Sequence, residues 1–201
     1  MLQLENRLDV GVLALDLHEL EVTGPRSEFD PEVAAAEEAA RAGRVGDVAP
    51  ARALYRRFGV DPTRYRPSSE ALLRRVRRGE GLPRVNSLVD VANVVSLHLQ
   101  VPLGLYDLAS IRGPLTLRLG VDRESYAGIR KETVNVGGRI CVADSVGPCG
   151  NPSSDSERTM ITTRTEEAAW IFFLPVAEAD LRFTYELVAR HGRGLVRLVE
   201  P

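Results

Sequence analysis

The chain is poor in cysteine and has no long apolar segment. Its 201 residues include two cysteines, Cys141 and Cys149, which are eight positions apart with no CxxC pattern and no histidine nearby. This spacing does not support zinc, so we expect two half-buried free thiols and neither a metal nor a cofactor. No run approaches the roughly 18 apolar residues of a membrane helix. The opening MLQLENRLDVG lacks the charged-then-apolar pattern of a secretory signal, so we expect a cytoplasmic protein that does not bind membranes.

The common catalytic motifs are also missing. The chain has no GxGxxG, Walker, HExxH or GxSxG pattern, and His18, His98 and His191 lie far apart. No nucleophile stands beside an evident base. This absence argues against covalent catalysis.

Positive charge is concentrated in one part of the chain. The net charge is -2, but residues 52–84 contain ten arginines and only three acidic residues. A run of this kind can be a solvated surface, or it can bind the phosphates of a nucleic acid, since arginine pairs with phosphate through two hydrogen bonds. The sequence leaves both interpretations open.

Apolar periodicity and turn residues predict a mixture of helices and strands. Strands are expected at 10–22, 115–120, 168–174 and 195–199, and helices at 30–43, 47–59, 68–79 and 177–191. Gly137-Gly138 predicts a hairpin within 133–144, and residues 145–159 read as an irregular loop that is long enough to bind a ligand. We therefore expect one compact α+β domain over 1–201, with mixed sheets flanked by helices.

The strongest helix signal lies in residues 85–107, VNSLVDVANVVSLHLQVPLGLYD, where PLGLYD is expected to form a turn after the helix. Apolar residues cover most of this helix. A separate polar stripe is formed by Asn86, Asp90, Asn93 and Gln100. Buried amides and carboxylates need hydrogen-bonding partners, which are here either neighbouring backbone or something that the protein binds.

The segment VDVANVVSLHLQVPLGLYD resembles the run VDVTNYVMLELGQPLHAFD of the B3/B4 domain in the phenylalanyl-tRNA synthetase β subunit. The positions that match are Val89, Asp90, Val91, Asn93, Leu97, Leu99, Pro102, Leu103 and Asp107, with Tyr106 in place of the aromatic residue. ICVADSVGP resembles the family's VIADASGP, and RPSSEAL, YAGIRKETVNVGG and SERTMITTRT resemble free-standing B3/B4 proteins. The resemblance is strongest over 60–192.

This resemblance implies a B3/B4 fold and a proofreading activity, the hydrolysis of the ester bond in a mischarged aminoacyl-tRNA. Such a site positions a water and uses a hydroxyl of the substrate's own ribose, which fits the missing nucleophile. The expected protein is a free-standing deacylase that edits mischarged tRNA in trans and has no aminoacylation activity. The open alternatives are a non-catalytic module that binds an amino acid or a tRNA end, and a scaffold for protein interaction.

The resemblance also proposes site residues. Asn86, Asp90 and Glu157 are expected to be catalytic, with Glu157 the nearest match to the glutamate of the family's Gly-Gly-Glu loop and Asp155 its competitor. The expected substrate-binding residues are Asn93, Gly104, Asp144, Asp155, Thr159 and Thr165, where Thr165 is the better match to the family's threonine. The expected RNA-binding residues are Arg74, Arg75, Arg77, Arg78 and Arg84.

Two departures from the family pattern bear on this activity. Gly104 stands where the family has histidine, so the role of that imidazole is lost or supplied elsewhere. Cys149-Gly-Asn-Pro-Ser-Ser replaces the Arg/Trp-rich stretch of many free-standing relatives, so we expect the pocket to admit a different side chain.

Overall fold

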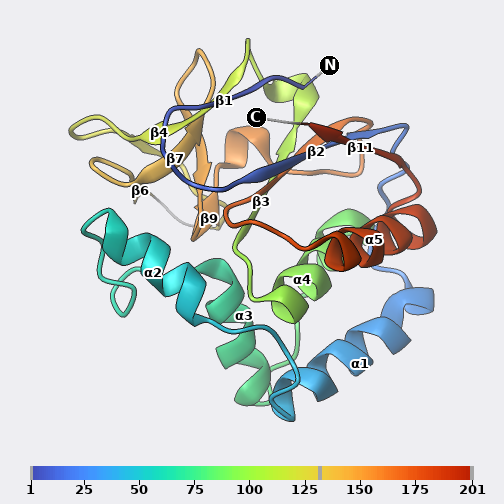
Figure 1. Ribbon diagram of the computed structural model, residues 1–201. Coiled ribbons are helices and arrows are strands. Elements are labelled where there is room, and N and C mark those ends of the chain that lie inside the picture. Colours follow the sequence, from blue (N-terminus) through green and yellow to red (C-terminus); the bar gives the residue numbers. More distant parts are fainter. Residues whose placement is uncertain (1, 131–132, 200–201) are drawn as a thin grey trace.

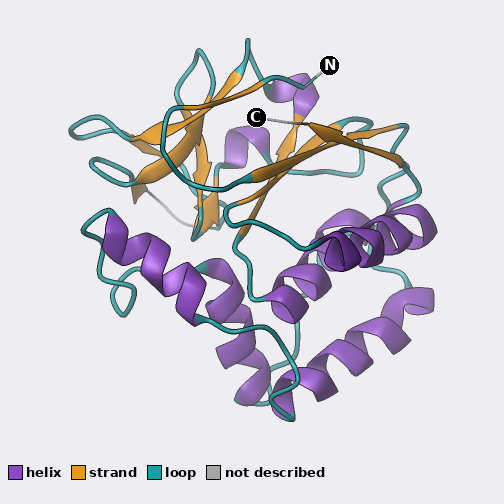
Figure 2. Cartoon of the chain, viewed as in Figure 1, coloured by secondary structure: helices purple, strands orange, loops and turns teal. Residues whose placement is uncertain are grey.

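A computed structural model describes residues 2–130 and 133–199 of the chain. Helices fill one side of the molecule and sheets the other (Figures 1 and 2). The α-helices are α1 (Asp30–Arg41), α2 (Ala49–Arg57), α3 (Ser68–Arg77), α4 (Ser87–Leu99) and α5 (Glu178–Leu187). The strands are β1 (Leu4–Asn6), β2 (Leu13–His18), β3 (Leu103–Asp107), β4 (Leu115–Leu119), β5 (Ser125–Tyr126), β6 (Val134–Asn135), β7 (Ile140–Ala143), β8 (Pro148–Asn151), β9 (Ser154–Asp155), β10 (Ala168–Phe172) and β11 (Leu195–Val199).

The strands form two principal sheets. One has the order β1-β4-β7-β8-β9, in which β1 pairs with β4 in parallel and the other pairs are antiparallel. The second has the order β11-β2-β10-β3 and is antiparallel throughout. Strands β5 and β6 pair separately. The chain is therefore an α+β protein with mixed sheets, as the sequence predicts.

The sheet β11-β2-β10-β3 is covered on both faces. Trp170 and Phe172 belong to an apolar cluster shared with the helices, while Ala169 and Ile171 belong to a cluster shared with the other sheet. Because both faces are buried, β10 reads as a continuous apolar run rather than an alternating one.

Helix α4 lies at the centre of the helical layer and is almost entirely buried. It packs on α1 and α3 and carries the apolar residues Leu88, Val91 and Val95 into the core. Its last turn ends at Gln100, which has a left-handed conformation with φ of 56°. The position of α4 matters for function because one of its sides lines a cavity.

Three sequence predictions about local structure are wrong. The PLGLYD segment is not a turn but contains β3, which pairs with β10. The strands on either side of Gly137-Gly138 do not pair with each other, since β6 pairs with β5 and β7 pairs with β4 and β8. Residues 145–159 are not irregular, because they contain β8 and β9.

Within the described ranges, the longest and most apolar helices fall short of what is needed to cross a membrane. The two cysteines are buried free thiols rather than half-buried ones.

Candidate functional site

A cavity of about 640 Å³ lies between α4 and the segment 153–161, and we call it the α4 cavity. Its apolar walls come from four segments of the chain. They are Leu72 of α3, Val89 and Ala92 of α4, Leu103 and Leu105 of β3, and Met160 and Ile161. The volume falls within the range of small-molecule binding sites, about 300–1,000 Å³.

Polar side chains also line the α4 cavity. Asn93 and Ser96 come from α4, Asp155 and Glu157 come from the opposite wall, and the other polar lining residues are Ser68, Arg130, Ser153 and Ser154. The Nδ2 of Asn93 donates to the carbonyl oxygen of Pro83 at 3.2 Å. Glu157 is exposed, and its carboxylate forms no hydrogen bond or ion pair within the described ranges. Its backbone is fixed, since its amide donates to the carbonyl of Ala127 at 2.9 Å.

Asp155 is the cavity residue whose protonation is most perturbed. Its Oδ2 accepts a hydrogen bond from the amide of Leu105 at 3.2 Å, whereas its Oδ1 is shielded from solvent and has no hydrogen-bond partner of good geometry. Burial raises the pKa of this carboxyl to about 7, although the Leu105 amide and the nearby Tyr106 hydroxyl oppose the rise. Near neutral pH the carboxyl can therefore either donate or accept a proton.

Gly104 lies beside this carboxyl for a steric reason. A Cβ at position 104 would lie 2.2 Å from the Oη of Tyr106, which is fully buried, and a Cβ at Gly150 would lie 2.4 Å from Oδ1 of Asp155 and 2.7 Å from the same Oη. The Tyr106 hydroxyl thus occupies the space that a side chain at position 104 would need. This explains why glycine stands where the resemblance expects histidine.

The two α4-associated residues predicted to be catalytic have structural partners and do not line the α4 cavity. Asn86 caps the helix, since its Oδ1 accepts from the amide of Val89 and its Nδ2 donates to the carbonyl of Ile161. Asp90 accepts from Nε of Arg84 and from the amide of Val85, both at 2.7 Å. The buried polar stripe of α4 is therefore satisfied mainly by its own neighbouring backbone, and a catalytic role for Asn86 and Asp90 stays a prediction.

Of the predicted substrate-binding residues, Asn93 and Asp155 line the α4 cavity and the rest do not. Asp144 forms an ion pair with Arg158 at 2.8 Å. Burial raises the pKa of Asp144, but the Arg158 guanidinium and two backbone amides outweigh burial and hold it below its usual value. Thr159 is buried, with its hydroxyl 3.5 Å from the carbonyl of Cys149. Thr165 donates to Asp107 at 2.8 Å.

The arginines predicted to bind RNA all have partners within the protein. Each of them contacts an acidic side chain or a carbonyl oxygen: Arg74 to Glu70, Arg75 and Arg78 to Glu80, Arg77 to Ala40, and Arg84 to Asp30 and Asp90. Their binding to RNA stays a prediction, but these contacts already offset part of their charge.

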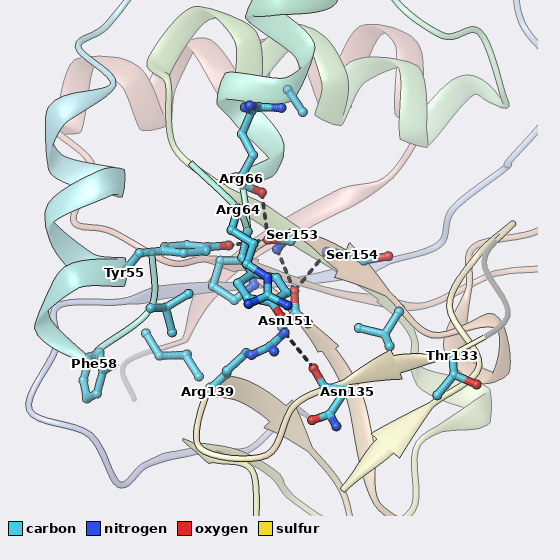
Figure 3. Close-up of a pocket in the computed structure, with 16 residues that line it drawn as sticks. Tyr55, Phe58, Arg64, Arg66, Thr133, Asn135, Arg139, Asn151, Ser153 and Ser154 are labelled. Atoms are coloured by element: carbon cyan, nitrogen blue, oxygen red, sulfur yellow. Dashed lines mark hydrogen bonds between the residues drawn. The ribbon is translucent and has the colours of Figure 1, made fainter. Parts of the chain in front are cut away.

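A second cavity, of about 520 Å³, lies next to the first (Figure 3). It was not predicted from the sequence. It is lined by Arg64, Tyr65, Arg66, Asn135 and Arg139 among others, and we call it the arginine pocket. Three of these residues lie in DPTRYRP, a loop between two prolines. The surplus of arginine in 52–84 was the only sign of this pocket in the sequence. Nothing in the sequence indicates that Arg139 lies beside Arg64 and Arg66.

No group of three or more His, Cys, Asp and Glu residues within 2–130 and 133–199 is placed to hold a metal ion. The α4 cavity thus offers apolar walls, two carboxyl groups, an amide, a guanidinium group and four serine hydroxyls. Such a set can bind an amino-acid moiety and orient a water, but it contains no cysteine and no histidine.

A sequence profile of the B3/4 domain matches residues 50–178. The chain belongs to the B3/4 domain family. The match contains α4, β3 and the segment 153–161, and every residue that lines either cavity of this family member lies within the matched region.

The similar curated proteins are phenylalanine–tRNA ligase beta subunits. The subunit of Brucella suis biovar 1 is 30% identical over 123 residues, which are 57% of this chain and 14% of that subunit. The subunit of Bartonella henselae is 31% identical over 97 residues, 45% of this chain and 12% of that subunit. This B3/4 chain therefore spans only a small part of its curated relatives.

A solved structure supports the fold. An N-terminal fragment of the phenylalanyl-tRNA synthetase beta subunit from Pyrococcus horikoshii matches with a TM-score of 0.51 and 14% identity, covering 98% of this chain and 50% of that fragment. At this identity the likeness concerns the fold alone. The prediction of a B3/B4-like α+β fold is confirmed.

Proposed function

We propose that this B3/4 protein hydrolyses the ester bond of mischarged aminoacyl-tRNA in trans, with the aminoacyl group in the α4 cavity. The observation that carries the proposal is the cavity itself, about 640 Å³ with apolar walls and the carboxyl groups of Asp155 and Glu157 on one side. Apolar walls suit an amino-acid side chain, and a carboxylate suits its ammonium group. The family relationship to the synthetase beta subunit supports tRNA as the carrier.

The reaction requires little from the protein. A water attacks the ester carbonyl, the tetrahedral intermediate loses the ribose oxygen, and the water's proton passes to that oxygen, giving a free amino acid and tRNA. The adjacent ribose hydroxyl of the substrate can relay the proton. The protein then acts by holding ester and water in position, and effective molarities for well-oriented groups reach about 10⁵ M or more.

Glu157 and Asp155 have different roles in this proposal. Glu157 is exposed at the cavity and unpaired within the described residues, so it is available to bind the substrate's ammonium or hydroxyl group. Asp155 lies deeper and is held by the Leu105 amide, so it acts on the polar end of the bound side chain rather than on the ester. Asn93, fixed on Pro83, completes the polar wall.

The test is deacylation of a panel of mischarged tRNAs by the wild-type protein and by Glu157→Ala. We expect at least one tRNA to be hydrolysed, and the variant to lose at least about tenfold in kcat/KM, since one lost hydrogen bond to a charged group costs about 1.5–3 kcal/mol. Glu166→Ala is the matched control, because Glu166 is exposed and does not line the α4 cavity. No hydrolysis of any tRNA at high enzyme concentration would refute the proposal.

A second candidate is a non-catalytic module that binds an amino acid or a tRNA end. It is favoured by the packing of Tyr106 against Gly104, which leaves no space for an imidazole at that position. A thermal-shift screen of free amino acids distinguishes the candidates. Stabilisation by one amino acid, with no turnover of any aminoacyl-tRNA, would support the binding module.

A further inference from the structure

The arginine pocket gathers positive side chains from two distant parts of the chain. Arg64 and Arg66 come from the loop before α3, and Arg139 comes from the turn before β7. The guanidinium carbons of Arg64 and Arg139 lie 5.3 and 3.6 Å from the ring centroid of Tyr65. The two side chains extend toward one another in the pocket, next to Asn135 (Figure 3).

These arginines differ from those of α3 in their partners. Within the described ranges the Arg64 side chain has no hydrogen bond or ion pair, and the Arg139 guanidinium donates only to the carbonyl of Asn135, at 3.1 Å. The Nε of Arg66 is buried without a hydrogen bond, and it lies 3.6 Å from a carboxylate of Glu70 that Arg52 and Arg74 also approach. Like charges brought together in a cavity repel one another unless an anion joins them.

The arginine pocket and the α4 cavity share a wall. Ser153 and Ser154 line both. The hydroxyl of Ser153 donates to the carbonyl of Arg66 at 2.8 Å and lies 2.5 Å from the Tyr55 hydroxyl. The Oδ1 of Asn151 accepts from the amides of Ser153 and Ser154. This fixed wall sets the relative positions of the two cavities.

We propose that the arginine pocket binds the backbone phosphate of the nucleotide that precedes the aminoacylated adenosine, with Arg64 and Arg139 as its ligands. This inference rests on the proposed function, because it places the adenosine over the Ser153–Ser154 wall with its aminoacyl group in the α4 cavity. Guanidinium groups bind phosphate through paired hydrogen bonds, and the stacking on Tyr65 orients them while leaving their N–H groups available.

The site is specific for a single-stranded RNA end rather than for a duplex. The pocket is concave, at about 520 Å³, and its cationic groups converge instead of following a groove. One phosphate can reach both guanidinium groups there. The arginines of α3, which are spread around that helix and paired with Glu70 and Glu80, provide only general attraction.

The test is binding of the 5′-fluorescein-labelled trinucleotide CpCpA to the full chain, followed by fluorescence anisotropy. In Arg64→Gln/Arg139→Gln we expect the Kd to rise at least about tenfold. The slope of log K against log salt should shrink by about 0.7, since the pocket neutralises one phosphate and each phosphate neutralised on a single strand contributes about 0.7. The matched control Arg41→Gln/Arg44→Gln removes the same charge from two exposed arginines that do not line the pocket, and it should change the Kd less than about threefold.

A trinucleotide with neutral methylphosphonate linkages should bind wild type and the pocket variant equally weakly. Equal losses of CpCpA affinity in the two double variants would refute phosphate binding in the arginine pocket. No binding of CpCpA by the wild type at millimolar concentration would refute it as well. A thermal unfolding scan of each variant shows that the fold is kept, and a pocket variant that unfolds is replaced by Arg139→Lys, which keeps the charge but loses the paired hydrogen bonds.

The probe carries no ester, so its binding is independent of hydrolysis. Pocket-dependent binding of CpCpA without deacylation of any tRNA would keep this inference and refute the deacylase. If the wild type deacylates a tRNA and Arg64→Gln/Arg139→Gln does so equally fast at substrate concentrations below KM, the deacylase is kept and the phosphate pocket is refuted.

Discussion

The buried carboxyl of Asp155 makes a prediction about stability and pH. Burial raises its pKa from 3.8 to about 7 in the folded state. Between about pH 4 and 7 the folded protein therefore holds a proton that the unfolded chain has released. The folded state binds more protons, so this group's contribution to the free energy of unfolding falls as the pH rises through that window, and is constant above it.

The magnitude follows from the size of the shift. About three pKa units at 1.36 kcal/mol each correspond to at most about 4 kcal/mol of stability lost between pH 4 and 8. Asp155 lies against a cavity that water can enter and is only half-buried as a residue, so we expect about 2 kcal/mol. Asp155→Asn keeps the acceptor for the Leu105 amide and removes the charge.

The assay is urea unfolding of the wild type and Asp155→Asn at several pH values from 4.5 to 8.5. Near pH 4.5 the two proteins should have similar free energies of unfolding, and above pH 7 the variant should be about 2 kcal/mol more stable. Taking the difference cancels the titration of all other groups. A difference that does not vary with pH would refute the reasoning, and a variant less stable at pH 8 would show that the charged carboxylate is stabilised in the fold.

Two further predictions concern stability at fixed pH. Gly104→Ala should destabilise the fold by about 1–3 kcal/mol in urea unfolding, because its Cβ would lie 2.2 Å from the buried Tyr106 hydroxyl. The control Gly24→Ala should have little effect, since no atom lies within 4 Å of its Cβ. Asn86→Ala should lower the free energy of unfolding by about 1–2 kcal/mol, since it removes the cap of α4 and the hydrogen bond to Ile161. Asn86→Asp should recover most of the cap. Equal stability of Asn86→Ala and the wild type would contradict the capping role of Asn86.

Local signals predicted the helices and the most apolar strands but not the pairing of short strands. Helix α1 begins at Asp30-Pro31 and β10 occupies the apolar run, as expected. Strand β3 was missed because Pro102 and Gly104 are turn signals, whereas the strand forms through its pairing with β10 and needs Gly104 to accommodate Tyr106. Pairing between distant segments has no signature within a short window of sequence.

The candidate site was predicted in part. The resemblance directed attention to Asn93, Asp155 and Glu157, which lie together at the α4 cavity. It also proposed Asn86 and Asp90, whose partners are a backbone amide and Arg84, and these contacts depend on how the chain enters α4. The arginine pocket could not be predicted, because its members are brought together only by the tertiary fold.

The most direct test of the account is single-turnover hydrolysis of the tRNA that the wild type deacylates best, compared with Val89→Trp. Val89 is half-buried and lines the α4 cavity, so an indole there fills the space assigned to the aminoacyl group while the core-facing side of α4 is unchanged. We expect the variant to fold and its rate to fall at least tenfold. A folded Val89→Trp protein that deacylates at the wild-type rate would contradict the assignment of the α4 cavity as the substrate site.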